Sequence, residues 1–317
     1  MKKKVLIIGG CGYIGSELTR FLKEDHDVST TDLEWFGNFN IGKKNRKRIN
    51  NMNDICDLKV EYVSQFRYVI LLAAHSSVKM CKDNSESSLK NNVLNFVKIL
   101  NMINKNQIFI YASSSSVYGD TKKKVVDEKY SNFEPNNYYD LSKHEIDSYA
   151  KLSDKTYYGL RFGTVNGASP NFRNDIMINA MTYNAIKNGK VFCFNPSIYR
   201  PILGIKDLCR AIGFILKKGT SKTSGIYNLA SFNSTARQIS NKVAKTLNVK
   251  MEVIKEIPKN ITNVKLQTKA YNFSISSKKF EETFDFEFEE TVESIVTSIA
   301  EEYDNMNMDN RSNAKIY

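Results

Sequence analysis

The chain has 317 residues, of which 41% are hydrophobic and 25% charged, and its net charge is +12 at pH 7. These values are those of an ordinary globular protein that can bury a full core. The start resembles a signal peptide, but its apolar run ends after four residues in glycines. No later segment approaches the roughly 18 apolar residues of a membrane span. We therefore expect a cytoplasmic protein without a membrane partner.

Cysteine and histidine are the residue types that would reveal a disulfide framework or a zinc site. The five cysteines are odd in number and scattered without a paired spacing, and there are only three histidines. We therefore expect reduced thiols and no metal ion.

Two basic runs, residues 43–48 and 122–124, raise the hypothesis of nucleic-acid binding. No aromatic residues interleave these runs to stack on bases. Solvated loops in a chain rich in lysine and asparagine are the preferred interpretation, with some bias toward anionic ligands. We expect no nucleic-acid partner.

Strand and helix patterns alternate through the first half of the chain. Residues 5–8 predict a buried strand, residues 15–23 a helix, and residues 27–31 a second strand that ends at Asp32. The apolar run 68–73 is typical of a central parallel strand covered on both faces. An apolar stripe predicts one helix between about residues 89 and 103, and residues 108–112 predict the next strand. The stripe consists of Leu89, Val93, Phe96, Val97, Leu100 and Ile103.

The second half is less regular. Residues 176–188 and 207–217 predict helices, residues 191–194 and 227–229 predict short strands, and the polar residues 303–317 predict a frayed end. The alternation indicates βαβ units, hence an α/β fold with a Rossmann-type doubly wound parallel sheet and a smaller C-terminal α/β substrate lobe. We place the first domain at residues 1–165, with a returning segment near 198–217, and the substrate lobe at residues 166–317.

A glycine-rich turn follows the first predicted strand, with glycines at Gly9, Gly12 and Gly15. The pattern alone is weak, but here a strand precedes it, a helix follows it, and an acidic residue ends the next strand. Gly9 permits the tight turn, Gly12 lets the backbone approach a pyrophosphate, and Gly15 allows close helix packing. The turn therefore predicts a dinucleotide site.

Asp32 lies where a carboxylate accepts hydrogen bonds from the adenosine ribose hydroxyls and repels a 2′-phosphate, which favours NAD over NADP. The basic residues 43–48 leave open the alternative that they fold back toward a 2′-phosphate. Asp57 and Leu58 follow a poorly defined strand, and we interpret them as an adenine contact, a helix N-cap, or both.

Tyr139 and Lys143 are spaced by one helical turn. A phenol with a pKa near 10 is a poor base at pH 7. A lysine on the same helical face, together with oxidised nicotinamide, would stabilise the phenolate and lower that pKa. The pair predicts a proton-transfer site.

Four serines, residues 113–116, follow the strand 108–112. They lie at the carboxyl end of a parallel strand, where open α/β sheets place their ligands. A serine there can hold the reacting hydroxyl against the phenol. Each pattern alone is common by chance, but their order after the glycine turn predicts an enzyme.

With these motifs, the chain resembles the extended short-chain dehydrogenase/reductase family, the NAD-dependent nucleotide-sugar epimerases and dehydratases, over roughly residues 3 to 235. The resemblance is carried by residues 9–15, Asp32, Asp57, Leu58, Leu72, Ala73, Ala74, residues 91–93, 113–119, 139–143 and 160–162, Arg200, Pro201, Ile202 and Asp207.

The resemblance implies site residues. Ser114 matches the family's catalytic Ser/Thr, Tyr139 its base and Lys143 the partner of the base. The implied NAD contacts are Gly9, Gly12, Tyr13, Ile14, Gly15, Asp32, Leu33, Asp57, Leu58, Leu72, Ala73, Ala74, Asn91, Tyr139 and Lys143. The implied contacts to a nucleotide-diphosphate sugar are Ser115, Ser116, Thr164, Asn179 and Arg200.

Departures from the family pattern narrow the implied chemistry. The resembling 4,6-dehydratases carry Asp and Glu where this chain has Ser115 and Ser116, and 3,5-epimerases carry a cysteine at the second of these positions. What remains is redox chemistry at C4 of the sugar. Thr164 stands for the usual Asn and Gly204 for the usual His, and residues 169–173 resemble one subgroup, so the substrate pocket is atypical.

We therefore expect a 4-epimerase or a C4 dehydrogenase that uses NAD. A 4-keto-sugar reductase is the alternative, and a cofactor-sensing regulator without catalysis is a further one. The stripe 89–103 and the helix of Tyr139 can pair across a twofold axis, as in the family's dimers, and we expect a homodimer; packing within one chain explains the same stripe. His75 is interpreted as a loop residue that lines the cofactor cleft rather than a catalytic group.

Overall fold

The computed structural model describes residues 2–38, 50–51, 54–122, 124–254 and 271–307. Its main sheet has seven parallel strands in the order β11-β7-β5-β4-β1-β2-β3. In chain order these strands are β1 (Lys4–Ile8), β2 (Asp27–Thr31), β3 (Asn50–Asn51), β4 (Tyr68–Leu71), β5 (Ile108–Ser114), β7 (Tyr157–Phe162) and β11 (Gly225–Leu229).

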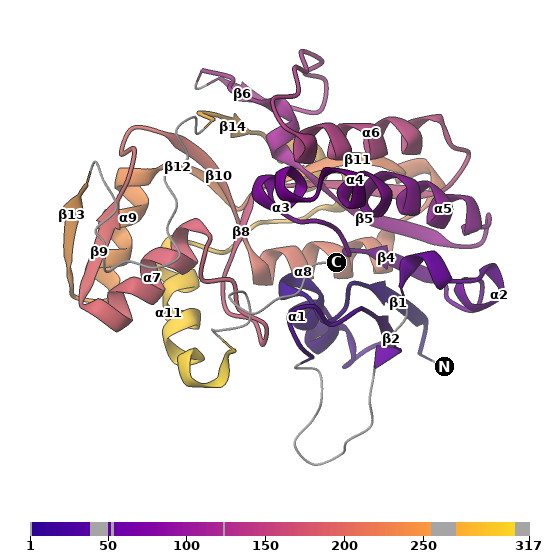
Figure 1. Cartoon of the computed structure of the whole chain (residues 1–317), viewed down its shortest axis with the longest axis horizontal. Coiled ribbons are helices and arrows are strands. Elements are labelled where there is room, and N and C mark those ends of the chain that lie inside the picture. The colour runs from indigo at the N-terminus through magenta and orange to yellow at the C-terminus, as the bar shows by residue number, and fades with distance from the viewer. Residues whose placement is uncertain (1, 39–49, 52–53, 123, 255–270, 308–317) are drawn as a thin grey trace.

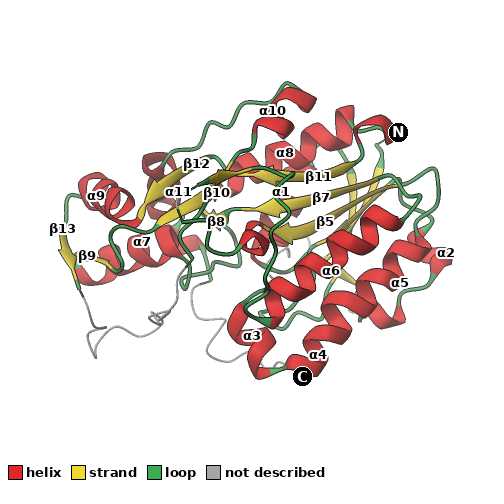
Figure 2. Ribbon diagram, turned by 90° about the horizontal axis from the view of Figure 1, so that it is seen from above, coloured by secondary structure: helices red, strands yellow, loops and turns green. Residues whose placement is uncertain are grey.

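Helices cover both faces of the sheet (Figures 1 and 2). One face carries α1 (Tyr13–Leu22), α8 (Ile205–Lys218) and α10 (Lys278–Phe284); the other carries α2 (Val60–Val63), α3 (Val78–Asp83), α4 (Ser85–Leu89), α5 (Asn95–Met102) and α6 (Tyr138–Leu152). In β1, Val5 and Ile7 pack into one core cluster while Leu6 and Ile8 pack into the other. Because successive strand residues face opposite ways, a sheet covered twice needs apolar residues at every position. The predicted doubly wound α/β fold is confirmed.

A second group of elements lies beyond one end of the sheet (Figure 2). It contains a three-stranded sheet, β12-β10-β8, a parallel pair, β13 with β9, and three helices. The strands are β8 (Thr164–Asn166), β9 (Lys190–Cys193), β10 (Tyr199–Gly204), β12 (Phe232–Thr235) and β13 (Lys250–Val253), and the helices are α7 (Met177–Asn188), α9 (Ala236–Thr246) and α11 (Val292–Glu301). The short strands β6 (Val125–Val126) and β14 (Ser274–Ile275) pair with each other.

The chain divides less simply than the boundary at residue 165 predicted. β11 lies far beyond that boundary, yet it forms the edge of the main sheet beside β7. Within the predicted returning segment, α8 covers the main sheet next to α1, whereas β10 belongs to the smaller sheet. The main sheet is therefore completed by residues from the second half of the chain.

The predicted frayed end differs for its first residues. Tyr303–Asn305 forms a short 3-10 helix, and the Asn307 amide donates to the Pro170 carbonyl at 3.1 Å. Met306 is buried in the core. The remaining residues of that end, 308–317, and the basic run 43–48 lie outside the described residues.

The helix predicted over 89–103 contains a π-helical turn, η2 (Lys90–Leu94), between α4 and α5. A π turn adds one residue and so rotates the helix on its C-terminal side relative to the helix on its N-terminal side. Accordingly Val93, Phe96 and Leu100 are buried, whereas Leu89, in the same predicted stripe, is 53% exposed. The single apolar stripe is thus interrupted at the π turn.

In the described part of the chain, no helix combines the length and apolarity that crossing a bilayer requires. A cytoplasmic location stays a prediction from the sequence.

Candidate active site

The glycine turn joins β1 to α1 at the carboxyl edge of the sheet. Gly9 has φ of +92°, and a Cβ there would lie 2.4 Å from the Ala73 nitrogen. A Cβ on Gly15 would lie 2.1 Å from the Gly9 carbonyl oxygen, so α1 packs directly on the turn. Gly12 is the N-cap of α1, and its Cβ would meet only the Gly9 carbonyl oxygen, at 3.4 Å. The turn therefore leaves space for a ligand at the helix N-terminus.

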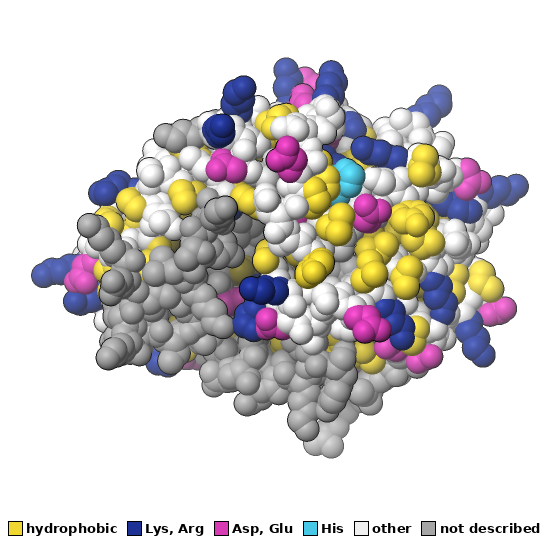
Figure 3. Space-filling model, turned by 45° about the horizontal axis from the view of Figure 1, so that its top comes forward, with side chains coloured by type: hydrophobic (Ala, Val, Ile, Leu, Met, Phe, Trp, Pro, Cys, Tyr) yellow, Lys and Arg dark blue, Asp and Glu magenta, His cyan; other side chains and the backbone are white. Residues whose placement is uncertain are grey.

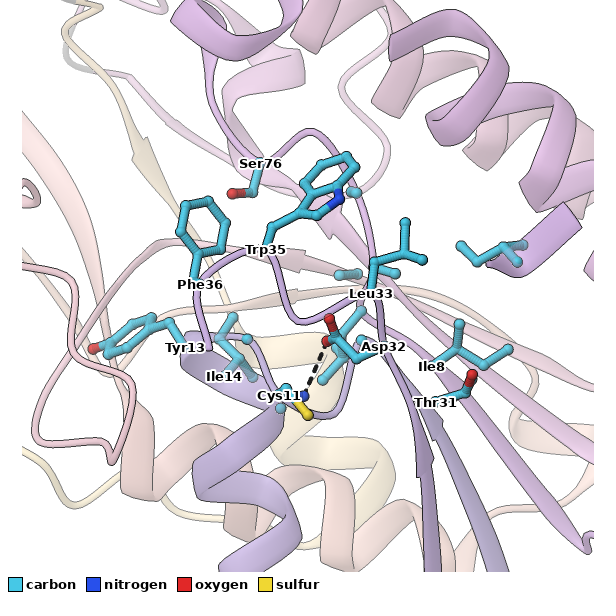
Figure 4. Close-up of a pocket in the computed structure, with 18 of the residues that line it drawn as sticks. Ile8, Cys11, Tyr13, Ile14, Thr31, Asp32, Leu33, Trp35, Phe36 and Ser76 are labelled. Carbon is cyan, nitrogen blue, oxygen red and sulfur yellow. Dashed lines mark hydrogen bonds between the residues drawn. The ribbon is translucent and has the colours of Figure 1, made fainter. Parts of the chain in front are cut away.

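A cleft lies over this turn and encloses about 970 Å³ of empty space, including open solvent (Figure 4). It is lined by eleven of the predicted NAD contacts outside the catalytic pair, namely Gly9, Gly12, Tyr13, Ile14, Gly15, Asp32, Leu33, Leu72, Ala73, Ala74 and Asn91. Its mixed polar and apolar lining is that of a ligand site.

Asp32 ties the end of β2 to the glycine turn. Its carboxylate accepts a hydrogen bond from the Cys11 amide at 3.0 Å (Figure 4). It also accepts one from the Glu34 amide at 2.7 Å. Burial raises the pKa of Asp32, and these amides oppose the rise. The carboxylate borders the cleft, so it fits the role of receiving ribose hydroxyls.

Two aromatic residues of the cleft wall were missed by the sequence analysis. Trp35 and Phe36 stand over the cleft in the loop after Asp32 (Figure 4). The Trp35 ring meets the ring of His75 edge-on, with centroids 5.4 Å apart. The only usable signal was an aromatic pair after the acidic end of a strand, because loop conformation is not encoded by periodicity.

The adenine contact at Asp57 and Leu58 stays a prediction, and neither residue is among those that line the cleft. Asp57 is exposed on η1 (Ile55–Asp57), and Leu58 is 4% exposed in the hydrophobic core. The cleft is lined instead by Asp54 and Ile55. The Asp54 side chain accepts from the Cys56 amide at 3.1 Å and so caps η1, which places the predicted N-cap three residues earlier.

Asn91 reaches the cleft from the π turn. Its amide lies 3.3 Å from Nδ1 of His75, whose Nε2 lies 3.1 Å from the Ser87 hydroxyl. His75 itself is 1% exposed and is not among the residues that line the cleft. This corrects its interpretation as a lining residue: His75 instead contacts the side chain of Asn91, which lines the cleft.

Ser114, Tyr139 and Lys143 meet where β5 ends against α6. The Lys143 ammonium donates to the Ala112 carbonyl at 2.7 Å, and Ala112 lines the cleft. The same nitrogen lies 5.8 Å from the centre of the Tyr139 ring. Hydrogen bonding with Ser114 acts to lower the pKa of the Tyr139 phenol, so the two side chains face each other. The structure thus brings the three predicted catalytic residues together beside the cofactor cleft.

The electrostatics of this group differ from the prediction. Burial raises the pKa of Tyr139 to about 12, and the hydrogen bond with Ser114 lowers it only in part. Burial also lowers the pKa of Lys143 to about 8. In the protein chain by itself, desolvation therefore outweighs the lowering of the phenol pKa by Ser114 and Arg173. A usable base requires a further positive charge near the phenol, which oxidised nicotinamide carries.

The two serines after Ser114 have different surroundings. The Ser115 hydroxyl donates to the Phe162 carbonyl at 2.8 Å and is buried. The Ser116 hydroxyl donates to the Asp140 carboxylate and lies 2.8 Å from the Ser114 hydroxyl. Ser115 was predicted as a substrate contact; its side chain instead fixes the end of β5 to β7.

Asn179 was also predicted to contact substrate, and the structure places it in the protein interior. Its Oδ1 accepts from the Gly167 amide at 2.9 Å, and its Nδ2 donates to the Tyr13 hydroxyl at 3.1 Å and the Arg173 carbonyl at 3.0 Å. It is fully buried. Asn179 therefore shapes the loop that faces the glycine turn rather than offering free groups to a ligand.

Thr164 begins β8, and Arg200 is the second residue of the neighbouring strand β10. Thr164 is partly exposed. The Arg200 guanidinium lies 5.7 Å from the centre of the Phe273 ring, and burial lowers its pKa. Among the described residues the Arg200 side chain forms no ion pair or hydrogen bond, so it remains a candidate for an anionic ligand.

Arg173 is a cleft residue that the sequence placed only within the subgroup-like segment 169–173, without a role of its own. It lines the cleft, and its guanidinium binds both carboxylate oxygens of Asp175, at 2.9 and 2.8 Å. Its charge also acts to lower the pKa of Tyr139. The residue lies on a loop far from the glycine turn in sequence, so its approach could not be read from spacing.

The model of the NAD dependent epimerase/dehydratase family matches residues 5–230. The chain belongs to this family. Membership confirms the predicted family resemblance and NAD as the cofactor, and the cleft residues above fit it.

Two curated relatives show the level of similarity. Protein CapI of Staphylococcus aureus is 28% identical over 239 residues, which are 69% of this chain and 70% of CapI. UDP-glucuronate 4-epimerase 4 of Arabidopsis thaliana is 28% identical over 210 residues, which are 60% of this chain and 47% of the plant protein.

Two solved structures show the same fold. UDP-glucose 4-epimerase from Thermotoga maritima has a TM-score of 0.79 at 20% identity, covering 95% of this chain and 98% of that one. dTDP-glucose 4,6-dehydratase from Bacillus anthracis has a TM-score of 0.76 at 20% identity, with the same coverage. Because epimerase and dehydratase superpose almost equally well, the fold does not select between these reactions.

Proposed function

We propose that this protein oxidises C4 of a nucleotide-linked sugar with NAD, as a 4-epimerase or a C4 dehydrogenase. The observation that carries the proposal is the convergence of Ser114, Tyr139 and Lys143 beside the cofactor cleft. Bound NAD supplies a hydride acceptor at this place. Tyr139 takes the proton of the sugar hydroxyl, Ser114 orients that hydroxyl, and Lys143 favours the phenolate.

Chemistry at C4 is favoured over dehydration by the residues after Ser114. Ser115 and Ser116 carry no acid or base of their own, and Ser115 is engaged with a backbone carbonyl. The curated 4-epimerase relative supports the same choice. An epimerase returns the hydride to the opposite face of the keto sugar, whereas a dehydrogenase releases the ketone.

The test begins with binding. A panel of UDP-, GDP-, dTDP- and CDP-sugars is screened by thermal shift, because a ligand that binds the folded state raises its stability by mass action. The sugars that bind are then mixed with the NAD-loaded protein under single-turnover conditions. We expect the nicotinamide absorbance to change with at least one of them, and the absence of any change would refute the proposal.

Product analysis of one turnover separates the candidate reactions. A C4 stereoisomer identifies an epimerase, and a free ketone with retained NADH identifies a dehydrogenase. Turnover only from a 4-keto sugar with NADH identifies the alternative, a 4-keto reductase. A regulator without catalysis would keep its biological activity in the Tyr139→Phe variant.

We also propose a homodimer through the face formed by α4, α5 and α6. Figure 3 shows exposed hydrophobic side chains gathered on this face. Leu89, Leu94, Tyr138 and Tyr149 are 53%, 59%, 55% and 45% exposed. Solution mass measurement should give a dimer that Leu94→Glu converts to a monomer. Val253→Glu, at an exposed site of the smaller lobe, is the matched control.

A further inference from the structure

Asp140 directly follows Tyr139 in α6, and its carboxylate is 1% exposed. One oxygen accepts from the Ser116 hydroxyl. The other accepts from the Asn137 amide at 2.6 Å and the Tyr271 hydroxyl at 2.9 Å. Within the ranges that the structure describes, no lysine or arginine forms an ion pair with it. A buried carboxylate is thus held only by neutral donors, which is costly for a purely structural group.

Hydrogen bonds lead from this carboxylate through Ser116 to Ser114, which faces the Tyr139 phenol. The Ser116 hydroxyl lies 2.8 Å from the Ser114 hydroxyl. Hydrogen bonding with Ser114 in turn acts to lower the pKa of Tyr139, so the Ser114 hydroxyl faces the phenol. Two hydroxyl groups, each both donor and acceptor, therefore separate the two titratable groups.

The charge of Asp140 decides the direction of these bonds. An ionised carboxylate only accepts, so Ser116 donates to it and must accept from Ser114. The Ser114 hydroxyl proton is then donated to Ser116. The Ser114 oxygen is left to accept from the phenol, as it already accepts from the Ser116 amide at 3.2 Å. When Asp140 is protonated, the bonds can reverse, and Ser114 donates to the phenol oxygen. The second arrangement stabilises a phenolate.

We propose that Asp140 is the proton partner of Tyr139. Protons pass between the two groups through the hydroxyls of Ser114 and Ser116. The phenol gives its proton to Ser114, Ser114 gives its own to Ser116, and Ser116 gives its own to the carboxylate. The Tyr139 O–H bond is broken and an Asp140 O–H bond is formed, with no change in total charge. Asp140 acts through other residues, so it is a positioning residue. The role of the relay in catalysis rests on the proposed function.

The surroundings of Asp140 favour a group that can hold a proton. Burial raises its pKa, although the three side-chain donors oppose the rise. The titratable groups that face it are Tyr139 on its own helix, Tyr271 before β14, and Cys81 on α3. Its negative charge raises the pKa of each of them. None of these neighbours supplies a positive charge that would hold Asp140 ionised.

The first test needs neither sugar nor NAD. The full chain is labelled with ¹³C at the ζ carbon of tyrosine, and the Tyr139 signal is identified as the one lost in Tyr139→Phe. As pH is lowered through the Asp140 titration, we expect this signal to shift in the wild type. This pH-dependent step in the Tyr139 signal should disappear in Asp140→Asn. It should persist in Asp154→Asn, because Asp154 is an exposed carboxylate just past the other end of α6.

Ser116 variants separate a relay from a simple charge effect. Ser116→Ala keeps the carboxylate and its charge but cuts the chain, so most of the step should be lost. Ser116→Thr keeps the hydroxyl and should restore it. A full-size step in Ser116→Ala would show that Asp140 acts through space and would overturn the relay. These variants also decide the question if Asp140→Asn fails to fold.

The second test uses single-turnover hydride transfer from a sugar that binds. We expect Ser116→Ala to slow transfer by roughly tenfold or more, within the range of general acid–base contributions, and to lose the lower-pH limb of the rate profile. Ser116→Thr should retain both. If no sugar is oxidised, the proposed function fails, while the tyrosine titration still tests the relay. An unchanged pH profile in Ser116→Ala would refute the relay's role in catalysis.

Discussion

The cofactor side and the sugar side of the site are built in different ways. The cofactor side is made largely of backbone: Gly9 and Gly15 fit against main-chain atoms, and Asp32 binds amides of the turn and of its own loop. The sugar side is made of side chains, and two of its predicted contacts, Ser115 and Asn179, are engaged inside the protein. A family motif that determines backbone conformation therefore predicts contacts in this chain better than a motif that only names a side chain.

The largest expected effect concerns Tyr139, where the two sides meet. Tyr139→Phe removes the group that exchanges a proton with substrate, so we expect kcat to fall by about 10²–10⁴-fold. The Kd for NAD, measured by fluorescence titration, should stay unchanged because the cleft wall is intact. Tyr138→Phe, at an exposed neighbouring position, is the control. Equal losses in both variants would contradict the assignment.

The cofactor side is tested by two alanine substitutions in one turn. Gly15→Ala forces a Cβ to 2.1 Å from the Gly9 carbonyl, and we expect about 3 kcal/mol of lost stability together with lost NAD binding. Gly12→Ala meets only one atom, at 3.4 Å, so it should weaken NAD binding with little loss of stability. Denaturant unfolding and NAD titration measure both effects. Equal unfolding midpoints would contradict this account.

In the smaller lobe, Glu290 occupies the space left by Gly204, the last residue of β10. A Cβ on Gly204 would lie 2.0 Å from the Glu290 carboxylate, which accepts from the Lys206 amide at 2.9 Å. Burial, followed by the charge of Asp207, raises the pKa of Glu290 to about 7. Gly204 stands where the resembling family has a histidine. The missing side chain leaves room for Glu290 to pack there.

The pH dependence of stability follows from this raised pKa. The unfolded chain releases the Glu290 proton near the ordinary pKa of 4.5, whereas the folded chain holds it to about 7. Stability from this group is therefore present below about pH 4.5 and is lost as pH rises to 7. Glu290→Gln should raise stability at pH 8 by up to about 3 kcal/mol, since one pKa unit equals about 1.4 kcal/mol. Unfolding of Glu289→Gln, an exposed neighbour, should keep the wild-type slope with pH.

The smallest effects compare Asn179 with Arg200. Asn179→Ala leaves the Gly167 amide and the Arg173 carbonyl without this partner, so we expect about 2 kcal/mol of lost stability. Arg200→Ala should leave stability unchanged and weaken nucleotide-sugar binding by about tenfold, the value of one charge-assisted hydrogen bond. Thermal unfolding and sugar titration distinguish them. A sugar-binding defect without instability in Asn179→Ala would restore its predicted role as a contact.

Much of the fold was predictable because apolar periodicity reports burial directly. The strand predicted at 27–31 coincides with β2, and the helices predicted at 176–188 and 207–217 correspond closely to α7 and α8. The π turn at Lys90–Leu94 was not predictable, since one extra residue in a helix leaves a pattern that still looks helical. The orientation of Asn91 toward the cleft depends on this π turn, so sequence spacing alone could not predict it.

The site was predictable where its residues lie close together in the sequence, and less predictable where loops that are distant in sequence meet. Tyr139 and Lys143 share one helix, so their proximity follows from a spacing of four residues. Arg173 and Trp35 reach the cleft on loops, and Asp140 turns toward Ser116 from the same helix as Tyr139. Which neighbour such a side chain finds depends on packing that no local pattern specifies.

The place of β11 at the edge of the main sheet has a consequence for synthesis on the ribosome. Until residues 225–229 emerge, β7 is an open edge with unpaired backbone groups, which is a site for mispairing. The cofactor domain cannot close as an independent unit after its own first half is made. We infer that folding waits for more than two-thirds of the chain, and that a chain cut near residue 165 yields an aggregating fragment rather than a miniature NAD-binding protein.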